Sequence, residues 1–203
     1  MTAIVVPVGF GNGPRFAIGS GPEPEFYEVL RADQSIALPH DAYQVWLTAH
    51  ADIESHANLT FTRERLVELA EPSVGDGTTE LVERLLSSRV LAEYEPGAES
   101  ALHFLRTHRL FPTAEGLGNT AEEPETFRIG KNGEVLLEVV PDVYTFWCGS
   151  YNSSSIWDDI VKYDLGLMSG SEEAPLTLEE LAQMFSAAVP MIVAARCGFL
   201  EPL

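Results

Sequence analysis

The chain has 203 residues, with 31 acidic and 12 basic side chains and a formal net charge of −19 at pH 7. Its hydrophobic share of 45%, with ten Phe, six Tyr and three Trp, is enough for a folded core and excludes a disordered chain. The acidic excess argues against nucleic acid as a partner, because affinity for phosphate polymers depends on cations.

The sequence predicts a cytoplasmic protein with no membrane partner. No stretch approaches the roughly 20 apolar residues that cross a bilayer. The start, MTAIVVPVGFGNGPRF, lacks the basic region of a secretory signal. The two cysteines, Cys148 and Cys197, are too few for a disulfide framework. Neither has a flanking histidine or cysteine that would activate it, so we expect two buried, inert thiols.

The first half begins with short β-rich runs and continues with helical spacing. The glycines of GFGNGP indicate a β-turn, and residues 4–19 predict a hairpin that turns at Asn12 and Gly13. The further strands expected are PRFAIGS, EFYEVLR and QSIALP. The helices expected are HDAYQVWLTA, TRERLVELA and TTELVERLLSSRVL, and LAEYEP closes the half.

The second half follows the same plan. Its expected strands are HRLFPTA, TFRIG and EVLLEVV, with a hairpin turn at Asn132 and Gly133. Its expected helices are PDVYTFWCGS, TLEELAQMFSAA and VPMIVAARCG, and Thr177 with Glu180 predicts a capping box for the second of them. An insertion at about residues 152–176 can hold one more short helix around IWDDIVKY.

One phrase, Asp-x-Tyr-x-x-Trp, occurs in both halves. Its copies are Asp41, Tyr43 and Trp46, and Asp142, Tyr144 and Trp147. The acid suits the first turn of a helix, and the two aromatic residues, three apart, share one helical face. The phrase therefore predicts the first core helix of a repeated unit, anchored to the sheet by its aromatic side chains. Arg89 and Arg196 fall near the same point of the last helix of each half.

The predicted fold class is α+β, with two tandem winged-helix-like units. Each unit is a small antiparallel sheet backing a three-helix bundle. The first unit spans residues 1–100, with the N-terminal hairpin, and the second spans residues 101–203, with the insertion at about 152–176. Three strands written before three helices resemble a winged helix-turn-helix, and most closely the PqqD-like peptide-recognition domain.

That resemblance implies peptide binding by addition of a strand beside the third strand, with the peptide side chains resting on the third helix. In the first half, the implied partner-binding residues are Gln34, Ile36, Leu38, Leu85 and Ser88. In the second half, they are Val135, Leu137, Val139 and Ile192. An alternative stays open, in which the two halves cover these strand edges for each other.

The sequence contains no recognisable catalytic motif, and we expect no cofactor. The most metal-like string is HADIESH, in which His50 and His56 are weak candidates. On a helix, His50 and Glu54 share one face while Asp52 and His56 share another, so the four side chains do not converge. We therefore expect no metal site.

The leading hypothesis is a non-enzymatic binding or adaptor protein that recognises a peptide or protein partner, which could be basic. The first alternative is a diverged winged-helix transcription regulator. Its DNA contact would fall on a wing or on the basic joint formed by His103, Arg106, His108 and Arg109. The second alternative is an enzyme or small-ligand binder, which would require a deep pocket with several convergent polar groups.

Overall fold

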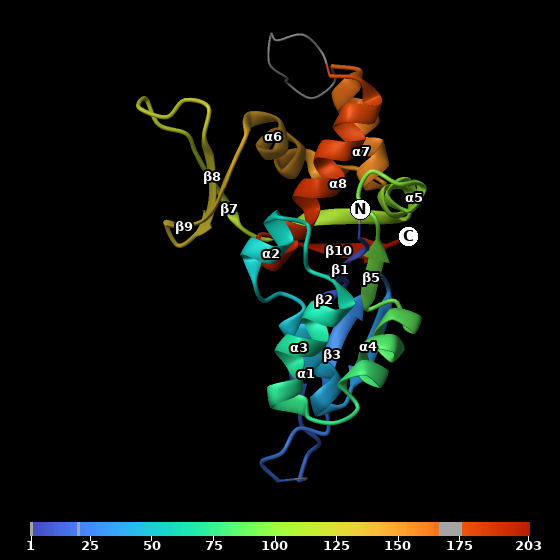
Figure 1. The fold of residues 1–203 in the computed structure, drawn as a ribbon. Helices are drawn as coiled ribbons and strands as arrows, with labels where there is room; N and C mark the ends of the chain where they lie inside the picture. The colour runs from blue at the N-terminus through green and yellow to red at the C-terminus, as the bar shows by residue number, and fades with distance from the viewer. Residues whose placement is uncertain (1, 20, 167–175) are drawn as a thin grey trace.

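The computed structural model describes residues 2–19, 21–166 and 176–203, and its fold is α+β (Figure 1). The first half contains β1 (Ile4–Pro7), β2 (Phe10–Arg15), β3 (Phe26–Arg31), β4 (Gln34–Leu38), α1 (His40–Thr48), α2 (Ile53–Ala57), α3 (Arg63–Val74), α4 (Thr78–Ser87) and β5 (Leu91–Tyr94). After α5 (Glu99–Thr107), the second half contains β6 (His108–Pro112), β7 (Glu115–Gly118), β8 (Phe127–Lys131), β9 (Glu134–Val139), α6 (Pro141–Gly149), a 3₁₀ turn (Ser150–Asn152), α7 (Ile156–Asp164), α8 (Leu178–Ala194) and β10 (Gly198–Pro202).

In the described residues, each half has one three-stranded antiparallel sheet and one two-stranded ribbon. The sheets have the strand orders β2-β3-β4 and β7-β8-β9. The ribbons pair the first strand of each half with its last strand, as β1 with β5 and β6 with β10. Among the described residues no helix has the length and the apolar character to cross a membrane.

The predicted N-terminal hairpin is wrong. β1 pairs with β5, and Asn12 and Gly13 lie inside β2, where the register with β3 shifts between Gly11 and Gly13. Gly13 has a φ of 79°, which suits a bulge. The physical reason is burial, because the side chains of β1 are covered on both faces while β2 lies at the surface. A strand covered on both faces needs a partner in the interior.

The second predicted hairpin is confirmed. Lys131 and Glu134 pair across a two-residue loop, and Asn132 and Gly133 adopt φ values of 54° and 81°. These positive values define the turn that matches the twist of the two strands. β3 and β4 are joined in a similar way, with Ala32 at a φ of 52°.

The repeated phrase forms α1 and α6, with its acids in the first turns as predicted. Tyr43 stacks on Tyr27 of β3 at 4.6 Å between ring centroids, and Tyr144 packs on Phe127 of β8 at 4.7 Å. The buried indoles extend the parallel, because each donates its N–H to a backbone carbonyl of its own half. Trp46 donates to Val8 at 3.1 Å, and Trp147 donates to Cys197 at 2.9 Å. Both helices are thus fixed to the neighbouring sheet and ribbon by the same side chains.

The helices of the second half differ from the prediction. TLEELAQMFSAA and VPMIVAARCG form one helix, α8, that continues through Pro190, and α7 provides the helix between α6 and α8. The capping box of Thr177 and Glu180 is confirmed. Residues 167–175 of the predicted insertion lie outside the described residues.

Helix α8 tolerates its internal proline because another group satisfies the freed carbonyl. Pro190 has no N–H to donate to the carbonyl of Ser186, four residues earlier. The hydroxyl of Tyr94, on β5, donates to that carbonyl at 2.7 Å. Tyr94 is fully buried, so the bond is shielded from water. A strand of the first half therefore completes the hydrogen bonding of the longest helix of the second half.

The two halves pack as one body around the ribbon of β1 and β5. Val5 of β1 and Leu91 of β5 lie in the core of the first half. Ile4, Val6 and Tyr94 lie in the core of the second half. In addition, α2 packs against α8, and Figure 1 shows the ribbon where the lower first half meets the upper second half. The two faces of the ribbon therefore pack into different hydrophobic cores.

Candidate functional site

A groove with a volume of about 520 Å³ lies between β4 and α4 in the first half. It is lined by Ile36, Ala37, Leu38, Pro39, Asp41, Ala42, Asp76, Gly77, Glu80, Leu81, Arg84, Leu85 and Ser88. Four of the five residues that the sequence suggests for this half are among them: Ile36, Leu38, Leu85 and Ser88. Gln34 is not, and its side chain accepts a hydrogen bond from Arg31.

β4 is the outermost strand of its sheet, so one of its edges is unpaired by any strand among the described residues. Arg31 and Gln34 pair across the two-residue turn, as a hydrogen-bonded pair does in such a hairpin. Counting along the strand, the backbone N–H and C=O groups of Ser35 and Ala37 point away from β3. Both residues are exposed, which leaves these groups accessible to an added strand.

The floor of the groove is apolar and rigid. Leu38 is 6% exposed and Leu85 is 2% exposed, and half-buried Ile36 and Leu81 lie beside them. The guanidinium of Arg31 donates to the backbone carbonyl of Ser88 and so ties the end of α4 to β3. The width of the groove is therefore set by a direct contact between the strand layer and the helix layer.

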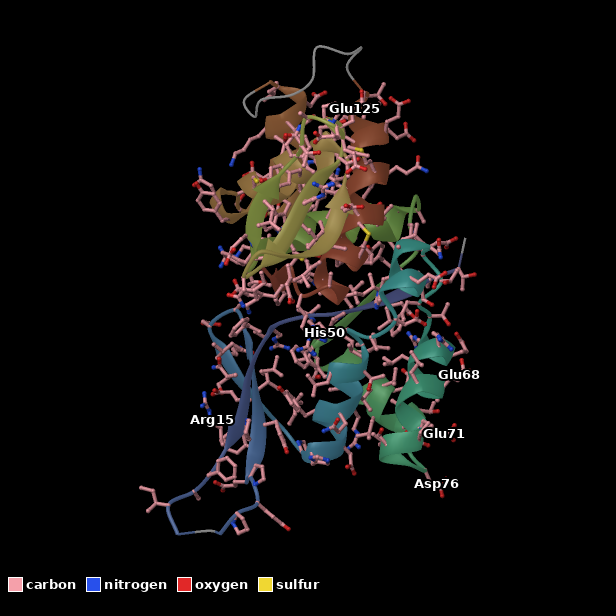
Figure 2. All side chains as sticks on the ribbon, turned by 90° about the vertical axis from the view of Figure 1, so that its left-hand side faces the viewer. Arg15, His50, Glu68, Glu71, Asp76 and Glu125 are labelled. Atoms are coloured by element: carbon pink, nitrogen blue, oxygen red, sulfur yellow. The ribbon has the colours of Figure 1, made fainter. Side chains whose placement is uncertain are left out.

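The rim of the groove is acidic. Asp41 lies in the first turn of α1, Asp76 lies in the connection before α4, and Glu80 lies in the first turn of α4. Figure 2 shows Asp76 at the far end of the first half, with its side chain directed outward. Arg84 is the one basic side chain that lines the groove. Within the described part of the chain, none of these four side chains forms an ion pair with another residue. The groove therefore carries uncompensated negative charge.

The second half does not present the corresponding residues in the same way. Val135 is 47% exposed, but Leu137 and Val139 are 6% and 7% exposed, and Ile192 is fully buried. In addition, α2 of the first half packs against α8 of the second half. One half covers the other at this point, whereas the groove of the first half stays open.

Each of the two histidines of HADIESH forms a hydrogen bond with a backbone carbonyl. A ring nitrogen of His50 lies 3.1 Å from the carbonyl of Trp46, and one of His56 lies 3.1 Å from that of Ala49. Burial lowers the pKa of both histidines to about 4, with the positive charge of Arg196 contributing at His50. Within residues 2–19, 21–166 and 176–203, no three His, Cys, Asp or Glu side chains are grouped so that they could hold a metal ion.

The thiols and the basic joint show no reactive arrangement. Cys197 is buried, and burial raises the pKa of its thiol to about 11. Cys148 is exposed, which corrects the prediction that both thiols are buried. In the joint, Arg109 pairs with Glu201 at 2.7 Å and Arg106 lies over the ring of Trp157 at 4.8 Å. Both arginines of the joint thus interact with other side chains of the protein.

The acidic rim is the part of the groove that the sequence does not single out. Asp41 is predicted only as a first-turn acid, and Asp76 and Glu80 are two among 31 acidic residues. The available signal is their position, since Asp76 directly precedes Gly77 and Glu80 lies in the first turn of the helix expected to contact a peptide. No protein-family model, no curated protein and no solved structure matches the chain. The role of the groove is therefore assigned from its geometry and charge.

Proposed function

We propose that this protein is a non-enzymatic adaptor whose first half binds a positively charged peptide segment, added as a strand to β4. The observation that carries the proposal is the edge of β4 that no strand in the described part of the chain pairs, beside an apolar groove with an acidic rim. The element order that resembles PqqD-like domains supports the same binding mode.

The backbone of the peptide would pair with Ser35 and Ala37, whose N–H and C=O groups point outward. Because side chains alternate along a strand, every second peptide side chain would face the helices and rest on Leu81 and Leu85. Main-chain hydrogen bonds then provide affinity, and the apolar floor selects the side chains at alternate positions.

The acidic rim of the groove favours a positively charged peptide. A lysine or arginine at the ends of the bound segment would approach Asp41, Asp76 and Glu80. Exposed ion pairs contribute only about 0.2–1 kcal/mol each, so they tune the choice of partner more than they set affinity. The net charge of −19 adds long-range attraction and speeds association with cationic partners at low salt.

The last helix of each half, α4 and α8, supports this reading over DNA recognition. A recognition helix needs exposed Arg, Lys, Asn or Gln to reach base edges. Helix α4 instead exposes Glu80 and Glu83 beside Arg84, and ten residues of α8 are buried.

We also propose a cytoplasmic location, because neither cysteine forms a disulfide and both remain thiols.

The test is fluorescence anisotropy with a labelled peptide of alternating Lys and Val, and a matched peptide of alternating Glu and Val. We expect saturable binding of the Lys peptide, weakened by salt, and no binding of the Glu peptide. Ala37→Pro removes one outward N–H without touching the bonds to β3, and should weaken binding about tenfold. Ala37→Val keeps that N–H and is the matched control.

Two outcomes would refute the proposal. Equal affinity of the Ala37→Pro and Ala37→Val variants would show that the peptide does not pair with β4. Equal binding of the Glu and Lys peptides would show that the acidic rim does not select the partner. Glu80→Lys provides a second check, since it should weaken the Lys peptide and leave the fold unchanged by circular dichroism.

A further inference from the structure

A second cavity, of about 220 Å³, lies where the two halves meet. We call it the interface pocket, and it is lined by Gly9, Phe10, Gly11, Tyr43, Trp46, Leu47, His50, Thr113, Lys131, Arg196, Gly198 and Phe199. The N–H of Gly9 donates to the carbonyl of Leu200 at 2.8 Å, which joins the two halves beside it. Figure 2 shows His50 at this boundary.

The charged residues that line the interface pocket are basic, whereas the chain as a whole is acidic. Its lining includes Lys131 and Arg196 and no acidic residue, in a chain with 31 acids and 12 bases. Elsewhere in the described parts of the chain, six basic side chains form ion pairs with carboxylates, namely Arg15, Arg63, Arg65, Arg109, Arg128 and Lys162. Among the described residues, neither Lys131 nor Arg196 has a carboxylate within ion-pair distance. His50 adds no charge at neutral pH, because its pKa is lowered to about 4.

The backbone of Arg196 is held in a conformation that favours glycine. Its φ is 56°, in the left-handed region that L-residues with a side chain adopt at a cost. The N–H of Arg196 donates to Val193 at 3.0 Å, and its carbonyl accepts a bond from the hydroxyl of Thr113 at 3.0 Å. A cationic side chain thus stands at a rigid position where glycine would be less strained.

Aromatic rings form a large part of the other walls. Phe10 is 43% exposed, and its ring lies 5.2 Å from that of Phe199, across the boundary between the halves. Tyr43 and Trp46 stack at 5.6 Å, and the ring of His50 meets Trp46 edge-on at 4.6 Å. Flat apolar walls beside two cations suit a small molecule with an aromatic body and an anionic head group.

We propose that the interface pocket binds a small aromatic anion, whose carboxylate or phosphate pairs with Arg196 and Lys131 while its ring lies against Phe10 and Phe199. Arg196 can form two parallel hydrogen bonds with either head group. The volume of about 220 Å³ limits the ligand to roughly one ring and its substituent. This site is separate from the groove between β4 and α4.

The test is isothermal titration of the full chain with four single-ring probes: benzoate, phenyl phosphate, benzyl alcohol and benzylamine. We expect the two anions to bind, and the neutral and cationic probes not to bind. The stronger of the two anions identifies the head group. A nitrogen–proton spectrum gives a second readout, in which the indole signal of Trp46 should shift on binding while those of Trp147 and Trp157 stay in place.

Variants separate binding from folding. Arg196→Gly removes the cation and relieves the positive φ, so it should weaken the anions about tenfold or more without lowering the melting temperature. Lys131→Met should weaken them less. Arg89→Gly is the matched control, because Arg89 has a φ of 57° at the corresponding position of the first half and does not line the pocket.

Three results would overturn the proposal. Comparable binding of benzyl alcohol or benzylamine would show that charge does not select the ligand. Undiminished anion binding by Arg196→Gly would place the anion elsewhere. Absence of heat and of any indole shift at millimolar benzoate and phenyl phosphate would show that the pocket holds no aromatic anion.

Discussion

Removing the hydroxyl of Tyr94 tests how α8 accommodates its proline. In Tyr94→Phe, the carbonyl of Ser186 loses its donor at 2.7 Å in a fully buried position, and Pro190 cannot replace that donor. Leaving a buried acceptor unsatisfied costs about 1–3 kcal/mol. We therefore expect the free energy of unfolding to fall by about 2 kcal/mol, which lowers the melting temperature by roughly 4–8 °C for a chain of this size.

A double-mutant cycle identifies the cause. Pro190→Ala restores an N–H four residues after Ser186, so the carbonyl gains a donor from its own helix. In that background Tyr94→Phe should cost only about 0.5 kcal/mol, which gives a coupling energy of about 1–2 kcal/mol. The measurement is urea unfolding of the four proteins, followed by circular dichroism, with unchanged denaturant slopes. Tyr43→Phe is the control, because among the described residues the hydroxyl of Tyr43 has no hydrogen-bond acceptor, and it should change stability by less than about 0.5 kcal/mol.

The reasoning fails if Tyr94→Phe costs the same in both backgrounds. In that case the hydroxyl contributes through packing or through another acceptor, and the proline is tolerated for a different reason.

Three further predictions concern single sites. Burial raises the pKa of Asp159 from an ordinary 3.8 to about 6, so the folded state favours the protonated acid and loses stability as the pH rises through about 6. Asp159→Asn should therefore raise the free energy of unfolding by about 2–3 kcal/mol at pH 8 and change it little at pH 4, as measured by urea unfolding. Gly130→Ala should destabilise by about 2 kcal/mol or more in the same assay, because the new Cβ would lie 2.0 Å from the carbonyl oxygen of Glu134. Iodoacetamide at pH 8 should label Cys148 in the native protein and Cys197 only after unfolding, as read by peptide mass spectrometry, because Cys197 is buried with a pKa of about 11.

Each of these has a clear opposite result. An Asp159→Asn effect that is equal at pH 4 and pH 8 would show that ionisation of the acid is not involved. Gly133→Ala is the control for Gly130, since its Cβ meets open space and only its φ of 81° is strained; a larger loss there than at Gly130 would contradict the steric argument. Rapid native labelling of Cys197 would mean that its surroundings open readily.

The sequence predicts what local chemistry determines and misses what distant segments determine. The turn at Asn132 and Gly133 follows from the conformational preference of two residues. The pairing of β1 with β5 does not, because nothing near Asn12 signals a partner eighty residues away. Pro190 likewise suggests a helix boundary, and only Tyr94, from the other half, explains why α8 continues.

The same division holds for the candidate sites. Ile36 and Leu85 follow from the element order, which places the third strand beside the third helix. The charge of the groove does not follow from it, because Asp41 and Glu80 approach one another only after α1 and α4 have packed. Arg196 lies in a pocket whose other walls come from both halves, and so no pattern within either half marks it.

The ribbon of β1 and β5 means that neither half can be excised as an independent module. A fragment of residues 1–100 would expose Ile4, Val6 and Tyr94 to water, and a fragment of residues 101–203 would lack the strands that close its core. Such fragments would aggregate when produced separately and recover a native fold only when produced together.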